Sequence, residues 1–180
     1  MIIMNQIHGL IDQKKKAEVL QRIRDRKAPF CATKSEPDRR PDAKANPITK
    51  GQRKLNNELI EAAKAGNYEI VKTLIEKGAD VNAKDELEIT ALMWASAWGR
   101  TEVAKLLIKN NADVNAKDSN GWTALMKASV NNNFETSELL LEKGADVNAR
   151  DNYGKTALDR AREFGQLIVA GLLVENGATE

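Results

Sequence analysis

The chain has 180 residues, 42% of them hydrophobic and 30% charged, a balance typical of globular proteins rather than of disordered or membrane chains. Apolar stretches such as residues 167–174 fall short of the roughly 20 residues that a bilayer-spanning helix needs, so we expect no membrane segment. The N-terminus lacks the pattern of a signal peptide, and the single cysteine, Cys31, excludes an internal disulfide. We therefore expect a cytoplasmic protein. The net charge of +2 is unevenly divided, because residues 1–54 hold 14 basic and 6 acidic residues whereas residues 55–180 hold 14 and 20.

Residues 1–28 are predicted to form a basic amphipathic helix. Apolar residues from Ile7 to Ile23 recur at close to 3.6-residue spacing, and most basic residues lie elsewhere on the helix. We call these basic residues the basic arm: Lys14, Lys15, Lys16, Arg22, Arg24 and Arg26. Three interpretations stay open, namely a solvated tail, an arm attracted to nucleic acid or another anionic surface, and a helix that docks on the acidic remainder of the chain. Nucleic acid is the weaker partner, since only Phe30 could stack on bases.

Residues 29–54 are predicted to be a basic linker. They contain all four prolines of the chain, Pro29, Pro37, Pro41 and Pro47. Such a composition buries too little apolar surface to offset the entropy lost on ordering.

Residues 55–180 repeat themselves with a period of 33 residues, and such periodicity outweighs local signals in predicting a fold. The sequence Ala-Asp-Val-Asn-Ala-Lys-Asp occupies residues 79–85 and 112–118, and it returns at 145–151 with Arg replacing Lys. Thr-Ala-Leu recurs with the same period, starting at Thr90, Thr123 and Thr156. Four copies can be traced, at about residues 55–85, 86–118, 119–151 and 152–180, the first without Thr-Ala-Leu. The threonines are expected to cap short helices.

These motifs resemble the ankyrin repeat family, whose Thr-Pro-Leu-His-x-Ala element reads Thr-Ala-Leu-Met-Trp-Ala at residues 90–95. The resemblance covers about 126 residues and implies an all-α fold, an ankyrin-type α-solenoid of four helix–turn–helix repeats. The amphipathic helix predicted from the apolar spacing at the N-terminus precedes this solenoid. Ala replaces the family's Pro, and Met or Asp replaces its His. Asn111 and Asn132 replace two glycines, which agrees with the fold because Asn also tolerates a left-handed cap.

The sequence predicts no catalytic group, metal site or cofactor. His8 and Cys31 are each the only residue of their type, and the glycines follow the repeat period rather than a nucleotide-binding motif. Asp80 and Asp85 could resemble a catalytic carboxylate pair, but a group present in every repeat is expected to serve turn and cap hydrogen bonds. The same reasoning applies to the asparagines of these turns, Asn82, Asn115 and Asn148.

Positions that differ between the repeats are free to recognise a partner. Aligning the repeats gives three such positions, occupied by Leu87, Asn120 and Tyr153; by Ile89, Trp122 and Lys155; and by Trp98, Asn131 and Phe164. The family resemblance places them at the turn tips and on the exposed side of the first helix, the usual concave binding face. Four of the eight aromatic residues of the chain occupy them, and exposed rings are common interface anchors. The alternative is that Trp98 and Trp122 cover seams between repeats.

Two further features are candidates for binding. Trp94 aligns with Lys127 and Arg160 and is expected either to be partly buried or to extend the binding face. In the last helix Ile168 and Gly171 replace charged residues of the earlier repeats and, with Leu172, predict an apolar docking patch. Either the N-terminal helix of the same chain or a second chain could cover this patch.

The sequence as a whole predicts a non-catalytic protein–protein interaction scaffold, acting as an adaptor, inhibitor or immunity-type partner. The alternative is a regulator whose basic arm contacts nucleic acid while the repeats hold a protein. The expected oligomeric state is a monomer or a homodimer formed through the C-terminal repeat.

Overall fold

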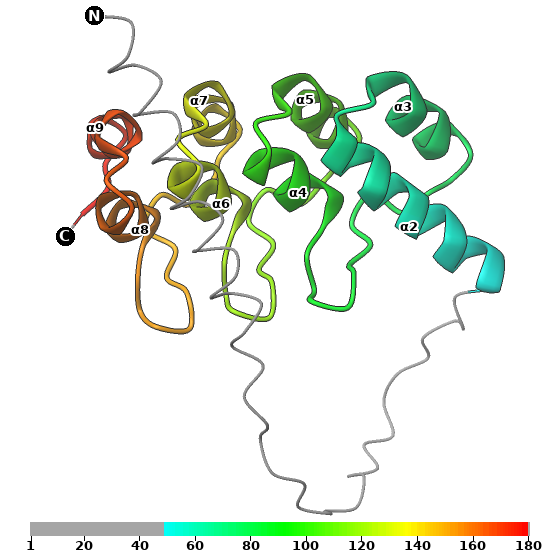
Figure 1. The fold of residues 1–180 in the computed structure, drawn as a ribbon, viewed down its shortest axis with the longest axis horizontal. Helices are drawn as coiled ribbons and strands as arrows, with labels where there is room; N and C mark the ends of the chain where they lie inside the picture. Colours follow the sequence, from blue (N-terminus) through cyan, green and yellow to red (C-terminus); the bar gives the residue numbers. More distant parts are fainter. Residues whose placement is uncertain (1–48, 180) are drawn as a thin grey trace, which may run out of the picture. The chain divides into compact units, whose positions relative to one another are not determined.

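The computed structural model describes residues 49–179, so the predicted helix at residues 1–28, the basic arm and most of the predicted linker lie outside the described part. Within residues 49–179 the chain forms eight α-helices in four consecutive pairs, which confirms the predicted all-α repeat architecture (Figure 1). The helices are α2 (Lys50–Ala65), α3 (Tyr68–Glu76), α4 (Ala91–Ala97), α5 (Thr101–Lys109), α6 (Ala124–Val130), α7 (Phe134–Glu142), α8 (Ala157–Glu163) and α9 (Leu167–Glu175).

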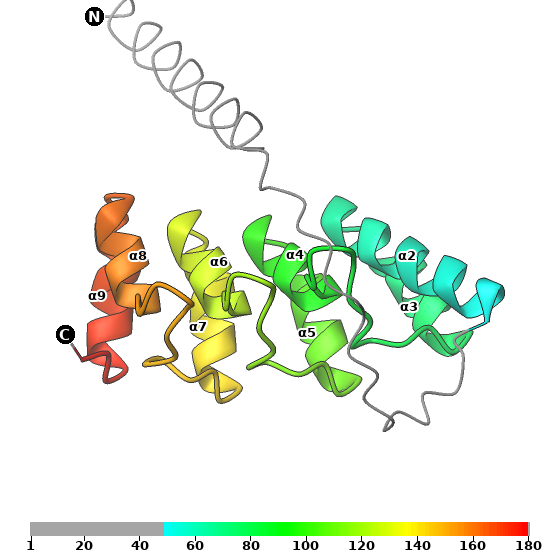
Figure 2. The ribbon, with the colours of Figure 1, turned by 90° about the horizontal axis from the view of Figure 1, so that it is seen from below.

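The helices of residues 49–179 form two layers. The first helices of the pairs, α2, α4, α6 and α8, lie side by side, and the second helices, α3, α5, α7 and α9, form the other layer (Figures 1 and 2). Each helix packs on the other member of its pair and on its counterpart in the next pair. The loops that join successive pairs project from the helices on one side (Figure 1). We call these three loops the hairpins.

Threonine starts the first helix of each of the last three pairs. The hydroxyl oxygens of Thr90, Thr123 and Thr156 accept hydrogen bonds from the third residue of the helix that follows, at 3.2 to 3.3 Å. The backbone of each threonine is extended, as an N-cap requires. The predicted capping role is confirmed.

The core runs along the interface between the two layers. Leu92, Leu125 and Leu158 occupy the same position in successive repeats and are almost wholly buried, as are Leu107, Leu140 and Leu173 of the second helices. Small residues, Ala95, Ala128 and Ala161, are fully buried between the first helices and allow them to approach closely. Each repeat therefore buries its apolar surface mainly against its neighbours.

Left-handed backbone conformations lie at turns between and after the helices. Asn111 and Asn132 have φ of 66° and 58°, so the prediction that they replace glycines at such positions is confirmed. A third residue was not anticipated. Glu88 has φ of 60° at the position that Gly121 and Gly154 occupy in the next two hairpins.

The predicted boundary of the linker at residue 54 is wrong, because α2 already begins at Lys50. The Thr49 hydroxyl accepts a hydrogen bond from the Gln52 N–H at 3.2 Å and caps the helix. Gln52, which lies before the predicted boundary, donates hydrogen bonds through its Nε2 to the backbone carbonyl of Gly78 at 3.0 Å and to Oδ1 of Asn56 at 2.9 Å. The additional helical residues are thus held by a contact that is distant in the sequence.

Among residues 49–179, no helix combines the length and the apolar character that crossing a bilayer would require.

Candidate functional site

Each hairpin is organised by one aspartate. Oδ1 of Asp85 accepts hydrogen bonds from the N–H groups of Leu87 and Ile89, both at 2.9 Å. Asp118 and Asp151 make the same two contacts with residues two and four positions later, at 2.8 to 3.0 Å. These aspartates therefore serve turn hydrogen bonds, as predicted.

The second oxygen of each aspartate accepts a hydrogen bond from the residue nine positions later. Asp85 Oδ2 accepts from the indole Nε1 of Trp94 at 2.9 Å. Asp118 Oδ2 pairs with Lys127 Nζ at 2.7 Å, and Asp151 Oδ2 accepts from Arg160 Nε at 2.9 Å. Three chemically different side chains thus perform one task, which is to tie each hairpin to the helix that follows it. Trp94 is half-buried, as one of the two expectations for it stated.

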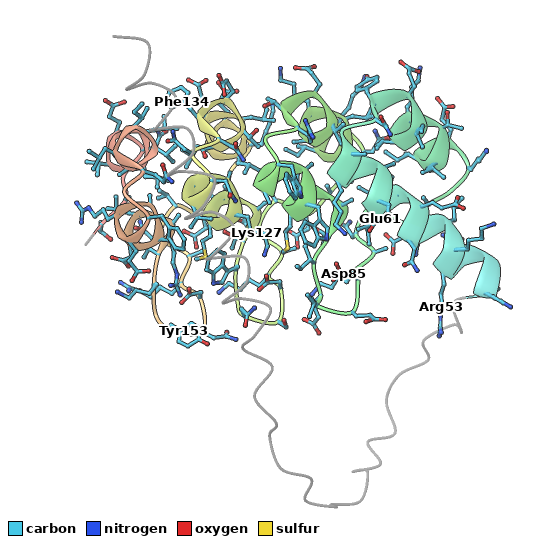
Figure 3. The ribbon with its side chains drawn as sticks, viewed as in Figure 1. Arg53, Glu61, Asp85, Lys127, Phe134 and Tyr153 are labelled. Atoms are coloured by element: carbon cyan, nitrogen blue, oxygen red, sulfur yellow. The ribbon has the colours of Figure 1, made fainter. Side chains whose placement is uncertain are left out.

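The hairpins and the first helices together present a surface that we call the inner face. It has a tip row (Leu87, Asn120 and Tyr153), a middle row (Trp94, Lys127 and Arg160) and a far row (Trp98, Asn131 and Phe164). Trp98 follows Trp94 by four residues, so both lie on the same side of α4, and the same spacing applies to the next two repeats. Figure 3 shows Asp85 and Tyr153 on their hairpins and Lys127 nearer the helices.

The tip and far rows leave large apolar side chains exposed. The exposed fractions are 59% for Leu87, 58% for Trp98, 74% for Tyr153 and 51% for Phe164. Asn120 and Asn131, which complete these rows, are exposed as well. The inner face therefore carries six predicted binding residues within reach of a partner.

Three other predicted binding residues are less accessible than expected. Ile89 is buried, with 6% of its surface exposed, so its predicted contact with a partner is wrong. Its counterparts Trp122 and Lys155 are half-buried; Trp122 packs against the core and Lys155 Nζ pairs with Glu163 at 3.0 Å. The left-handed residue just before this position redirects the chain toward the helices, which is why the position points inward.

Cations stack on aromatic rings across the inner face. Lys64 of α2 lies over the ring of Trp94, 4.3 Å from its centroid. Arg160 lies over both Trp122 and Tyr153, at 5.0 and 5.7 Å, and Lys127 lies 5.5 Å from Trp122. Trp94 and Trp122 each contact a cation of a neighbouring repeat, so both contribute to packing between repeats.

The turn asparagines link each repeat to the next. Asn82 Nδ2 donates to the backbone carbonyl of Asn111 at 3.0 Å, and its Oδ1 accepts from the Asp113 N–H at 2.8 Å. Asn115 and Asn148 repeat this pattern one and two repeats later. The structural role predicted for these residues is confirmed.

Three carboxylates in the last hairpin and in α8 have lowered pKa values. Burial alone would raise the pKa of Asp151, but hydrogen bonds from Arg160 and from the Lys155 and Tyr153 N–H groups bring it below its usual value. The Thr156 N–H lowers the pKa of Asp159, and the hydrogen bond from Lys155 lowers that of Glu163. Residues 49–179 hold no group of three or more side chains arranged as metal ligands.

The apolar docking patch predicted on the last helix is partly corrected. Ile168 is 66% exposed and Gly171 is exposed, but Leu172 is buried, with 8% exposed. Leu172 aligns with Leu139, which is also buried, so the position belongs to the packing of the stack. Leu167 and Val174, which were not anticipated, are exposed by 77% and 50%. The equivalent positions in α7 hold Phe134 and Leu141, which are half-buried and pack against the core. Since no repeat follows α9 in the described chain, alignment of the repeats could have indicated that Leu167 and Val174 are exposed.

Comparison with known protein families supports the repeat assignment. Residues 59–151 and residues 116–179 match a family model described as ankyrin repeats (3 copies). Together these overlapping matches cover more than half of the chain. A search of curated proteins found no match.

Proposed function

This chain belongs to the ankyrin repeat family, and we propose that it is a scaffold that binds another protein through the inner face. Ankyrin repeats generally mediate protein–protein interactions, and the family is typically non-catalytic. The finer roles that fit such a scaffold are those of an adaptor, an inhibitor or an immunity-type partner in the cytoplasm.

The observation that carries the proposal is the exposure of Leu87, Trp98, Tyr153 and Phe164 on one face. These side chains are mostly exposed and stand at positions that change from repeat to repeat, and together the two observations indicate that the stack itself does not need them. Large apolar side chains rimmed by polar groups are the usual anchors of protein interfaces. Covering them would remove apolar surface from water, which favours association.

The ion pairs of the middle row favour a partner that is held by apolar contacts rather than by ion pairs of its own. Lys127 and Arg160 already pair with the largely buried carboxylates of Asp118 and Asp151. Separating either pair would leave a buried charge without its partner, at a substantial free-energy cost. The partner is therefore expected to insert side chains between the tip and far rows and to leave these ion pairs intact.

The test is affinity capture from a lysate of the native host, with the bound protein identified and then purified. Trp98→Ala and Tyr153→Ala are expected to weaken its binding by at least about thirtyfold. Tyr68→Ala is the matched control, because Tyr68 is also exposed but lies on α3, in the second layer. Equal binding by the wild type and both inner-face variants would refute the proposal.

The charge of residues 1–54 favours a second candidate function, a regulator whose basic arm contacts nucleic acid. Their 14 basic and 6 acidic residues give a net charge of +8. Attraction to phosphate is independent of sequence and weakens steeply with salt. The triple variant Lys14→Gln, Lys15→Gln, Lys16→Gln is expected to reduce binding to a generic duplex at low ionic strength, and an absence of wild-type binding there excludes this function.

A further inference from the structure

The outward side of α9 is apolar where the other second helices are charged. The outward positions carry Glu69 and Lys72 in α3, Glu102 and Lys105 in α5, and Glu135 and Glu138 in α7. In α9 the same positions hold Ile168 and Gly171, flanked by the exposed Leu167 and Val174. We call these four residues of α9 the α9 stripe. They recur at spacings of three and four, so they line one side of the helix.

Gly171 has no structural role within the described chain. It lies in the interior of α9 with ordinary helical backbone, where glycine is less favourable than alanine. A Cβ built on Gly171 meets no atom within 4 Å, so an alanine would fit without a clash. A glycine on an exposed apolar side does, however, allow another helix to approach closely.

The α9 stripe is symmetric about this glycine. Gly171 is the central residue of α9, with Leu167 and Ile168 on one side and Val174 on the other. Two antiparallel copies that cross at Gly171 would place Val174 of each against Leu167 and Ile168 of the other. The two copies of Glu175, the only charged residue of α9, would lie at opposite ends of the helix pair.

From this self-complementarity we propose that the α9 stripe is a homodimer interface, occupied by the α9 stripe of a second copy of this chain. The contact is of the two-fold kind, in which one patch serves both subunits. An apolar helix with a single terminal charge fits an antiparallel copy of itself, because Leu167 and Ile168 of each copy meet Val174 of the other and the two Glu175 side chains stay apart.

The size of the α9 stripe sets the strength of the dimer. A contact of one short helix per subunit buries roughly 1,000 Å² in total, at the low end of specific interfaces. The dimer is therefore expected to be weak and to depend on concentration. The inner face is built from other elements and stays accessible, so a dimer offers two binding faces to a multivalent partner. This inference is independent of the proposed function.

The first test is sedimentation analysis of the full chain over a range of concentrations. The wild type is expected to shift from monomer to dimer, and Ile168→Glu, which restores the residue type of the three preceding repeats, is expected to raise the dissociation constant at least about tenfold. Ile70→Glu is the matched control, since Ile70 is 51% exposed on α3, in the first repeat, and should not affect the dimer.

The second test uses Gly171 directly. Gly171→Ala is expected to raise the melting temperature of the monomer, because alanine favours the helix, and yet to weaken the dimer, because its methyl group separates the helices. In a Cys31→Ser background, Gly171→Cys is expected to form a disulfide-linked dimer under mild oxidation, since the two-fold axis brings the residue against its own copy. Glu138→Cys, at the equivalent position of α7, should not form a disulfide-linked dimer.

Two results overturn the proposal. One is a wild type that stays monomeric at every concentration. The other is a dimer that Ile168→Glu and Ile70→Glu weaken equally. A monomeric wild type that Ile168→Glu destabilises would show that another segment of the same chain, such as the helix predicted at residues 1–28, covers the α9 stripe.

Discussion

The indole N–H of Trp94 donates a hydrogen bond to the carboxylate of Asp85 across 2.9 Å, the contact that Lys127 makes with Asp118 in the next repeat. The residue nine positions after each hairpin aspartate thus differs between repeats, but in every repeat it ties the hairpin to the helix that follows. Variation at a position shows that the fold does not require one particular side chain there. It does not by itself show that the position binds a partner. This distinction separates the middle row, which holds the hairpins, from the tip and far rows, which are exposed.

Removing Asp118 is expected to destabilise the third repeat strongly. Asp118→Ala leaves the Asn120 and Trp122 N–H groups and the Lys127 ammonium without their acceptor, which should cost about 3 kcal/mol. Asp118→Asn keeps an oxygen for the two N–H groups and should cost less. Urea unfolding of both variants measures the difference, and equal losses would show that the carboxylate charge has no role.

Relieving the left-handed backbone at Glu88 is expected to stabilise the protein. Glu88→Gly should raise the free energy of unfolding by about 1 kcal/mol, because only glycine adopts this conformation without strain. The exposed ion pair with Lys84 that is lost contributes little.

Gly154→Glu is the reverse control for that substitution. Gly154 has φ of 73° in the equivalent turn, and a Cβ there meets no atom within 4 Å, so backbone strain alone should lower stability by a similar amount. Thermal melting measures both variants. A Glu88→Gly protein no more stable than the wild type would mean that the turn tolerates glutamate without strain.

Substitution of Trp98 and of Trp122 is expected to have different effects on partner binding and on stability. Trp98→Ala should weaken partner binding by at least about 2 kcal/mol and leave stability within about 0.5 kcal/mol, since Trp98 is mostly exposed. Trp122→Ala should instead lower stability by about 2 kcal/mol, because its half-buried ring packs on the core and under Arg160. Calorimetric measurements of partner binding and of unfolding on both variants test this difference. If Trp98→Ala and Trp122→Ala lowered stability equally, Trp98 would be a packing residue.

Acid is expected to destabilise the last repeat. The folded pKa values of Asp151, Asp159 and Glu163 are lowered, so their contribution is fully present above the unfolded values near about pH 4 and is lost as pH falls through the folded values. Hydrogen exchange in α8 should therefore accelerate below about pH 4.

Glu163→Gln is the variant that tests the cause of this acid sensitivity. It removes one of the three carboxylates and should make the stability of the last repeat less dependent on pH. Acid-induced exchange that begins in α4 and spares α8 would contradict the assignment.

The sequence by itself determined the repeats, the helix caps and the asparagines in left-handed turns. These features depend on groups a few residues apart, such as the Thr123 hydroxyl and the Met126 N–H, or on the backbone preference of one residue. The tertiary structure alone decided that Ile89 and Leu172 are buried, that Trp94 is tied to Asp85 and that α2 starts at Lys50. Burial and the partner of a side chain depend on neighbouring repeats and on how each turn redirects the chain, and periodicity along the sequence does not record either.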